Sequence, residues 1–267
     1  SLMSFAAPAQ PAASAPPAPR RGLLRVLGVT FGLAVIIGNT IGAGILRTPG
    51  QVAEQLPSTG LYLAVWIAGG LYAMLGAVSL AELGAMVPRS GGLYVFSRRA
   101  LGPYAGFLVG WNDWAATCGS AAAVAMVLGE YTGALVPALE ERAVPVAMAV
   151  TVGFAALQWR GIRTAGTAQT VTSAAKAVVL LALVAACLLL PRLGPPMVPE
   201  PLPVPQGAAL LAAVVIALQG VIYTFDGWTG VLYFSGEVRD PGRDVPRAML
   251  GGVLAVTAIY LLLNLAF

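Results

Sequence analysis

Three ionisable side chains lie within long apolar segments of the chain: Asp113, Lys176 and Asp226. A charge at the centre of a bilayer costs about 2.5–3.5 kcal/mol or more, so such a residue is usually kept for a function or a specific partner. Lys176 lies midway along residues 164–190, too far from either end for its ammonium to reach water easily, and we interpret it as functional. Asp113 is closer to a segment end, and a structural role fits equally well. Glu82 is closer still to an end and is interpreted as a helix-end residue or loop tether.

Glycines interrupt the first apolar segment at Gly38–Ile45, which reads Gly-Asn-Thr-Ile-Gly-Ala-Gly-Ile. Each glycine weakens a helix by about 1 kcal/mol relative to alanine, so this stretch is predicted to unwind. The alternative is a stripe of small residues that lets two helices pack closely, and the glycine spacing alone does not distinguish the two. A phosphate-binding loop is disfavoured, because no Gly-Lys-Ser or Gly-Lys-Thr follows.

A second interruption is predicted within residues 207–236. As one straight helix these 30 residues would extend about 45 Å, well beyond the ~30 Å hydrocarbon core of a bilayer. The middle of the segment, Tyr223–Trp228, reads Tyr-Thr-Phe-Asp-Gly-Trp and places an acid directly before a glycine. Paired interruptions in corresponding positions of two halves are typical of the binding site of a membrane transporter.

Two unwound helices offer chemistry that suits an amino-acid zwitterion. Where a helix breaks, one half begins with free N–H groups and the other ends with free C=O groups. The N–H groups can bind a carboxylate and the C=O groups an ammonium, while glycine lets the ligand approach the backbone closely. Irregular backbone at membrane depth is tolerated only where it is buried in protein or lines a cavity. The two interruptions are therefore expected to lie together around one site.

The composition places these segments in a membrane. Hydrophobic residues make up 58% of the chain, its mean hydropathy is +0.82, and charged residues make up 10%, against about 25% in a soluble domain. The apolar runs are long enough for membrane helices and lack the alternating polarity of β-barrel strands. We predict an all-α integral membrane protein with seven spans. These are Val26–Leu46, Leu61–Ala81, Phe107–Gly129, Ala143–Trp159, Thr164–Leu190, Gly207–Gly236 and Ala248–Phe267.

The two sides of the seven predicted spans receive unequal numbers of arginines. Eleven fall on the side of the N-terminus and three on the other side. Because the side richer in Lys and Arg is usually cytoplasmic, the N-terminus is predicted to lie inside and the end of the seventh span outside. The net charge of +4 then reflects topology, and nucleic-acid binding is not needed to explain it. The eleven are Arg20, Arg21, Arg25, Arg89, Arg98, Arg99, Arg160, Arg163, Arg239, Arg243 and Arg247, and the three are Arg47, Arg142 and Arg192.

Metal, cofactor and disulfide sites are not predicted. Cys118 and Cys187 both lie inside apolar spans, and we interpret them as small packing residues. The chain contains no histidine and its acids are scattered, so no metal or cofactor is expected. Residues 1–22, rich in Ala and Pro, are predicted to be a disordered cytoplasmic tail rather than a secretory signal.

In order and spacing, several short motifs resemble bacterial amino-acid permeases of the amino acid–polyamine–organocation superfamily, similar to the L-type amino-acid transporters. The resemblance covers about Leu24–Phe267. Each motif alone is weak, but together they are specific. They are Gly38–Ile45, Ala81–Gly84, Pro88–Tyr94, Gly102-Pro103 with Trp111, Thr172–Lys176, Phe225–Trp228, Glu237–Pro241 and Arg243–Pro246.

The resemblance implies twelve helices, of which the first ten form two inverted five-helix repeats of the leucine-transporter type, with helices one and six broken. Residues 23–190 would then be the first repeat, 191–206 a Pro-rich extracellular loop, and 207–267 the first two helices of the second repeat. Helices eight to twelve are expected in a missing part of a longer chain or in another chain. The implied location is the cytoplasmic (inner) membrane.

The resemblance also assigns roles at the two breaks. The backbone amides of Ala43 and Gly44 would bind the substrate carboxylate, with Gly42 shaping the turn. Ala43 stands where a serine is often found, which removes a hydroxyl but keeps the N–H. The substrate-binding set implied in this way is Thr40, Ile41, Gly42, Ala43, Gly44, Tyr223, Thr224, Phe225 and Asp226.

The carbonyl groups of Thr40, Tyr223 and Asp226 would bind the substrate ammonium, and Tyr223 would also be an aromatic gate. Asp226 stands where L-type members have glycine, so a negative charge or a protonatable group would lie beside the ammonium. Lys176 matches a lysine that, in sodium-independent members, occupies the position of a sodium ion and contacts the glycine loop of the first helix.

The function implied is secondary active transport of amino acids by alternating access, as sodium-independent exchange or proton-coupled uptake. A polyamine or amine carrier is the alternative, with Asp226 as the countercharge. A seven-helix receptor or retinal protein is disfavoured, because the predicted cytoplasmic N-terminus is opposite to the orientation of that class. In addition, the only lysine lies in the fifth span, whereas a retinal Schiff base belongs in the seventh. A membrane-embedded enzyme is disfavoured because the chain has no histidine and offers no clear nucleophile–base pair.

Overall fold

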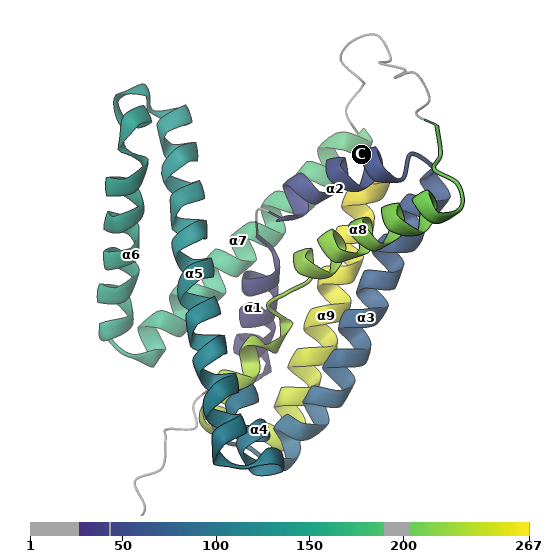
Figure 1. Ribbon diagram of the computed structural model, residues 1–267. Coiled ribbons are helices and arrows are strands. Elements are labelled where there is room, and N and C mark those ends of the chain that lie inside the picture. The colour runs from purple at the N-terminus through teal and green to yellow at the C-terminus, as the bar shows by residue number, and fades with distance from the viewer. Residues whose placement is uncertain (1–26, 43, 190–202, 267) are drawn as a thin grey trace, which may run out of the picture.

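The computed structural model describes residues 27–42, 44–189 and 203–266, and in these ranges the chain is almost entirely helical (Figure 1). One isolated parallel bridge joins Leu27 to Val238. The elements are α1 (Val29–Thr40), α2 (Gly44–Gln55), α3 (Thr59–Met86), α4 (Leu93–Leu101), α5 (Pro103–Leu135), η1 (Pro137–Arg142), α6 (Ala143–Trp159), α7 (Ile162–Leu189), α8 (Ala208–Thr224), η2 (Trp228–Glu237) and α9 (Pro241–Ala266), where η1 and η2 are 3-10 helices.

The membrane spans agree with an all-α membrane protein. Among the described residues, six stretches are long and apolar enough to cross a membrane, and α1 with α2 forms a seventh that is bent by 48°. One of the six stretches, Ala208–Glu237, consists of α8 followed by η2. The prediction of an all-α membrane fold is therefore confirmed.

The end predicted for the first span was wrong. We expected it to end at Leu46, but α2 continues to Gln55. Its buried face is formed by Ile45, Thr48, Pro49 and Val52, whereas Arg47, Gln51 and Glu54 are exposed. The polar face of such an amphipathic helix lowers the mean hydropathy of its sequence, so the apolar run ends before the helix does.

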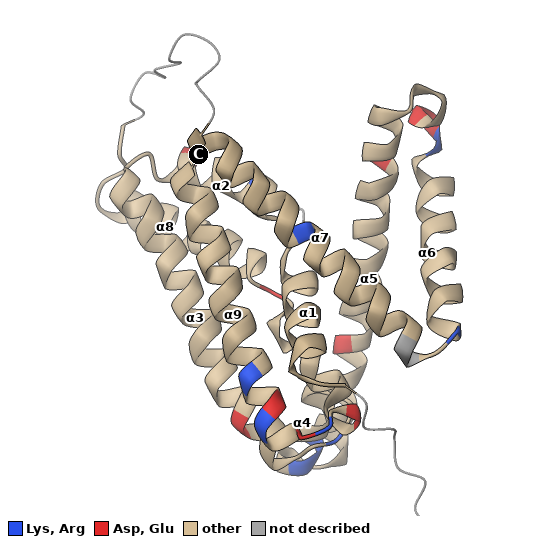
Figure 2. Ribbon diagram, turned by 180° about the vertical axis from the view of Figure 1, so that it is seen from behind, with Lys and Arg blue, Asp and Glu red and all other residues tan. Residues whose placement is uncertain are grey.

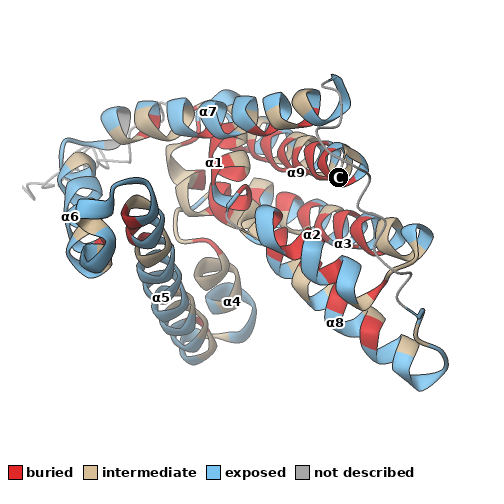
Figure 3. Cartoon of the chain, turned by 90° about the horizontal axis from the view of Figure 1, so that it is seen from above, coloured by how far each residue is buried: buried red, intermediate tan, exposed pale blue. Residues whose placement is uncertain are grey.

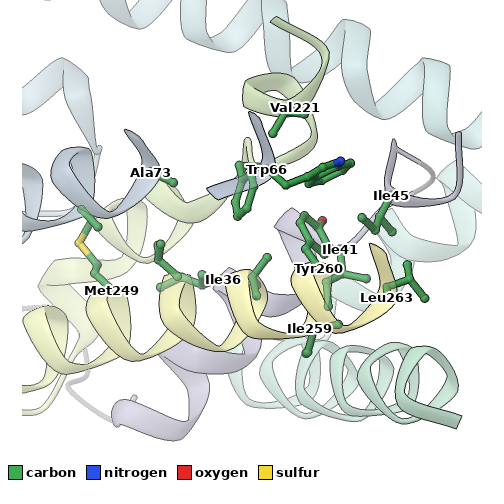
Figure 4. Packing of buried hydrophobic residues seen from close by; sticks show 14 of the residues in the cluster. Ile36, Ile41, Ile45, Trp66, Ala73, Val221, Met249, Ile259, Tyr260 and Leu263 are labelled. Carbon is green, nitrogen blue, oxygen red and sulfur yellow. The ribbon is translucent and has the colours of Figure 1, made fainter. Parts of the chain in front are cut away.

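The buried core lies where α1, α2, α3, α8 and α9 pack against one another (Figure 3). Trp66 of α3 and Tyr260 of α9 have no exposed surface, and both point into one cluster with Ile45 of α2 (Figure 4). Glycines permit this close packing. A Cβ on Gly252 of α9, for example, would lie 2.7 Å from Cγ2 of Ile36 on α1. The broken spans are thus fixed against two long continuous helices, α3 and α9.

The helices α5 and α6 form a hairpin that stands apart from this core (Figure 1). Their surfaces expose large apolar side chains such as Trp111, Leu128 and Val152. Such exposure is expected where the surrounding medium is lipid or further apolar helices. Cys118 of α5 and Cys187 of α7, interpreted from the sequence as small packing residues, are free thiols and lie on the exposed surface of the described residues.

Charged residues gather at one end of the molecule, around α4 and the start of α9 (Figure 2). The basic residues there include Arg98 and Arg99 of α4 and Arg243 and Arg247 of α9. The opposite end carries α2 and the beginning of α8 (Figure 1). These two ends define the two sides of the molecule, which we call the α4 side and the α2 side.

Candidate functional site

The first helix break lies between Thr40 and Gly44. The helix α1 ends at Thr40, and the next residue, Ile41, is extended while its N–H still donates to the carbonyl of Ile37 at 2.9 Å. Gly42 is exposed, and a Cβ there would meet nothing within 4 Å. Ala43 lies outside the described residues, so its expected amide donor has no position here. The break predicted from the glycines is present.

The second break follows Thr224, where α8 ends. Gly227 has a φ of +112°, which an L-residue rarely adopts, and the chain then continues as η2. The N–H of Gly227 donates to Oδ1 of Asp226 at 2.9 Å, so this carboxylate caps the turn locally. Asp226 is otherwise exposed, on the open side of the break.

The two breaks touch each other. A Cβ on Gly227 would lie 2.8 Å from the carbonyl carbon of Asn39 and 3.0 Å from the backbone nitrogen of Thr40. On the α2 side, the hydroxyls of Thr48 and Thr224 are hydrogen-bonded at 2.8 Å, and a Cβ on Gly44 would lie 3.3 Å from Thr224 Oγ1. The prediction that the interruptions lie together therefore holds for their backbones.

Lys176 reaches the first break from α7. Its Nζ donates to the carbonyl of Gly38 at 2.9 Å and to that of Ile41 at 3.3 Å. These carbonyls belong to the end of α1, where the helix dipole favours a positive charge. The α1 and α7 backbones approach closely because Gly38 has no side chain, and a Cβ there would collide with Ser173 Oγ. The contact expected between Lys176 and the glycine loop is thus present.

Tyr260 of α9 was not predicted from the sequence, yet it joins both breaks. Its buried hydroxyl donates to the carbonyl of Thr40 at 2.8 Å and lies 3.1 Å from that of Thr224. The ring packs on Trp66 and Phe225, with centroids 5.9 and 5.0 Å away. A single tyrosine within the aliphatic run of the seventh span was the available signal.

Two of the three carbonyl groups expected to bind an ammonium already accept a hydrogen bond. The Thr40 carbonyl accepts from Tyr260, and the Tyr223 carbonyl accepts from the N–H of Asp226 at 3.1 Å. A carbonyl oxygen has two lone pairs, so each can still accept a second donor. The hydroxyl of Thr40 is buried and has no hydrogen-bond partner among the described residues.

The side chains expected at the site do not all face it. Phe225 is only 2% exposed, and its ring belongs to the core behind the break. Tyr223, by contrast, is 72% exposed and borders two cavities. The first, of about 570 Å³, lies between α2 and α8, and the second, of about 360 Å³, contains Asp226 and Trp228 in its lining. Gln219 and Tyr223 line both, so the cavities are adjacent.

No group of three or more His, Cys, Asp or Glu residues that could hold a metal ion occurs in the part of the chain that the structure describes. Two charged side chains border the breaks: Lys176 of α7 contacts the first, and Asp226 lines the second cavity. What the arrangement offers a ligand is mainly backbone donors and acceptors between two packed helix ends.

Comparison with known proteins gives a consistent result. The profile of a family described as amino acid permease matches residues 22–267. The serine/threonine exchanger SteT of Bacillus subtilis is 29% identical over 256 residues, covering 92% of this chain and 55% of the relative. The human b(0,+)-type amino acid transporter 1 is 29% identical, with 92% and 51% covered. The mouse Asc-type amino acid transporter 1 is 30% identical, with 93% and 48% covered. The chain thus spans about half the length of these relatives.

Proposed function

Because this chain belongs to the amino acid permease family, we propose that it forms part of a transporter that carries amino acids across a membrane by alternating access around the two helix breaks. The observation that carries the proposal is the direct contact between the breaks, with Gly227 against Asn39 and Tyr260 bridging Thr40 and Thr224. The complete transporter would include helices eight to twelve, from a longer chain or from another chain. No enzymatic activity is proposed.

Within this proposal, the amides at Ala43 and Gly44 bind the substrate carboxylate. The carbonyls of Thr40, Tyr223 and Asp226 bind the ammonium. The exposed Gly42 between the two half-helices supports this assignment. A Cβ on Gly44 would lie 3.3 Å from Thr224 Oγ1, so the backbones come close there. The wall of the site is completed by Ile41, Gly42, Thr224 and Phe225. The Phe225 ring supports it from the core behind the break.

We further propose that the α4 side, with its arginines, faces the cytoplasm and that the protein lies in the inner membrane of a bacterium. The mode of transport is sodium-independent exchange or proton-coupled uptake. The name of the Bacillus subtilis relative, an exchanger of serine and threonine, favours exchange. Uptake of a panel of labelled amino acids into proteoliposomes loaded with or without unlabelled amino acid tests both points.

Substrate choice is expected to require both charged ends. In a dehydrated site an unpaired donor or acceptor costs about 1–3 kcal/mol, so loss of either end should weaken competition about tenfold or more. Serine should compete for uptake, whereas ethanolamine, which lacks the carboxylate, and 3-hydroxypropanoate, which lacks the amine, should compete poorly. Strong inhibition by putrescine would instead favour a polyamine carrier with Asp226 as the countercharge.

Transport is expected to be independent of sodium. The Lys176 ammonium already occupies a position between the Gly38 and Ile41 carbonyls, where a bound cation would otherwise neutralise the end of α1. Replacing external sodium with choline at constant ionic strength should leave the initial uptake rate unchanged. A hyperbolic dependence of the rate on sodium concentration would contradict this role.

A further inference from the structure

A hydrogen bond on the η2 side of the second break joins η2 to α5. The hydroxyl of Tyr233 donates to the carboxylate of Asp113, 2.9 Å from Oδ1 and 3.0 Å from Oδ2. Both residues are half-buried and lie 120 positions apart in the sequence. A hydroxyl bonded to an ionised carboxylate makes a stronger bond than one between neutral groups, and low local polarity strengthens it further.

The Tyr233 ring lies in a slot that depends on a glycine. Gly92, which precedes α4, has a φ of +55°, and a Cβ on it would lie 2.9 Å from Cε1 of Tyr233. Close by, the N–H of Gly236 donates to Oγ of Ser90 at 3.2 Å. The loop between α3 and α4 therefore holds η2 at two points, and Asp113 holds it at a third.

The segment just before α1 is hydrogen-bonded to the end of η2 and to the residues that follow it. The N–H of Leu27 donates to the carbonyl of Glu237 at 3.1 Å, and the N–H of Arg239 donates to the carbonyl of Leu27 at 2.8 Å. Displacement of η2 would therefore carry the start of α1 with it. On the α2 side, by contrast, one cavity lies between α2 and α8, and a second, adjacent one is lined by α3, α8 and the first residues of η2, Trp228 and Thr229. The described residues are thus fastened at the later part of η2, Tyr233–Glu237, and open toward α2 and the start of η2.

We propose that Asp113 is a positioning residue that acts through Tyr233 to hold η2 against α5, so that the α4 side of the substrate site stays closed. This proposal rests on the proposed transport function. For the site to open on the α4 side, η2 must leave α5 and the hydrogen bond must break. The bond therefore sets the balance between the state open on the α2 side and the state open on the α4 side.

The sidedness of substrate affinity tests the proposal. The apparent KM on each side varies inversely with the fraction of transporter open to that side, so the ratio of the two KM values follows the conformational balance. Tyr233→Phe and Asp113→Ala should each raise the ratio of the α2-side KM to the α4-side KM about tenfold, as expected for loss of a hydrogen bond to a charged group. The double variant should change it no further, because both substitutions remove the same bond.

Conservative and distant substitutions serve as controls. Asp113→Asn keeps a neutral acceptor oxygen for the Tyr233 hydroxyl and should therefore give a ratio between those of the wild type and Asp113→Ala. Tyr104→Phe and Glu130→Gln remove the same groups from exposed positions on the same helix α5 and should leave the ratio unchanged. A loss of Vmax that is equal in both directions, with an unchanged KM ratio, would show that Asp113 serves only folding and would overturn the proposal.

Hydrogen exchange separates this proposal from the transport function. In the purified complete transporter without substrate, amides of residues 228–237 should exchange faster in Tyr233→Phe and Asp113→Ala than in the wild type and in Tyr104→Phe. Faster hydrogen exchange in the two variants, combined with a wild-type protein that moves no amino acid, would contradict the proposed transport while supporting the contact. Amino-acid transport with unaltered hydrogen exchange and an unaltered KM ratio in the variants would contradict the positioning role alone.

Discussion

Gly227→Ala is expected to lower amino-acid uptake by the complete transporter about a hundredfold or more, which corresponds to roughly 2.7 kcal/mol. Two costs combine at this position. The φ of +112° strains any L-residue by about 1–3 kcal/mol, and the added methyl group would lie 2.8–3.0 Å from the backbone of Asn39 and Thr40. That backbone cannot shift freely, because the Thr40 carbonyl accepts the Tyr260 hydroxyl at 2.8 Å. The two breaks would be forced apart.

The matched control for Gly227→Ala is Gly161→Ala. Gly161, between α6 and α7, has a similar φ of +104°, but a Cβ there would meet nothing within 4 Å. It therefore reports the cost of strain without the collision. Initial uptake rates should be divided by the amount of folded transporter, measured by fluorescence-detected size exclusion. Equal losses of rate in both variants would mean that the contact between the breaks has no role in transport.

Much of the fold could be predicted because membrane helices leave a strong compositional record. The long apolar runs indicated the spans, and the excess length of residues 207–236 indicated that one helix had to break. The end of the first span could not be found in this way, because the exposed residues Arg47 and Glu54 make α2 amphipathic. Hydropathy detects contact with lipid, whereas this half-helix packs along α8 through Thr48 and Thr224.

The site was less predictable because its contacts are largely between backbone atoms. Glycine spacing pointed to both breaks, but it could not show that Gly227 packs on Asn39. Tyr260 was missed because one hydroxyl in an aliphatic span carries no local signal of the carbonyls it reaches, which are 36 and 220 positions away. Phe225 shows the reverse case, since its neighbours in the sequence line the opening while its ring is buried behind it.

Lys176 could be predicted in part from the sequence, and its atomic contacts come from the structure. Its isolation within an apolar span indicated a function, and the contact with the glycine loop came from the resemblance to known permeases. The structure adds which atoms it binds, the Gly38 and Ile41 carbonyls. Since these carbonyls end α1, the ammonium takes over hydrogen bonds that the helix itself cannot supply. The broken span is therefore contacted at its end by a side chain from another helix, α7.

Lys176→Met should lower both uptake and substrate affinity in the complete transporter at least tenfold. A hydrogen bond to a charged group contributes about 1.5–3 kcal/mol, and methionine keeps the length and apolar stem of lysine while removing both bonds. Without its donor, the Ile41 carbonyl would no longer be held beside Gly42 and Gly44, so the amides proposed to bind the substrate carboxylate would lose their fixed orientation. Membrane insertion should be unaffected, because an apolar side chain is favourable in a span.

Two further variants separate the loss of charge from the loss of these two bonds. Arg47→Gln removes a positive charge from an exposed position on α2, near the same break, and should leave affinity within about twofold of the wild type, as is usual for surface substitutions. Lys176→Arg keeps the charge but replaces a compact ammonium with a planar fork that matches neither carbonyl well, so it should rescue only part of the loss. Titration calorimetry with the best substrate of the uptake panel measures all three. Wild-type affinity in Lys176→Met would show that the end of α1 keeps its shape without the ammonium, and the lysine would then have no part in organising the site.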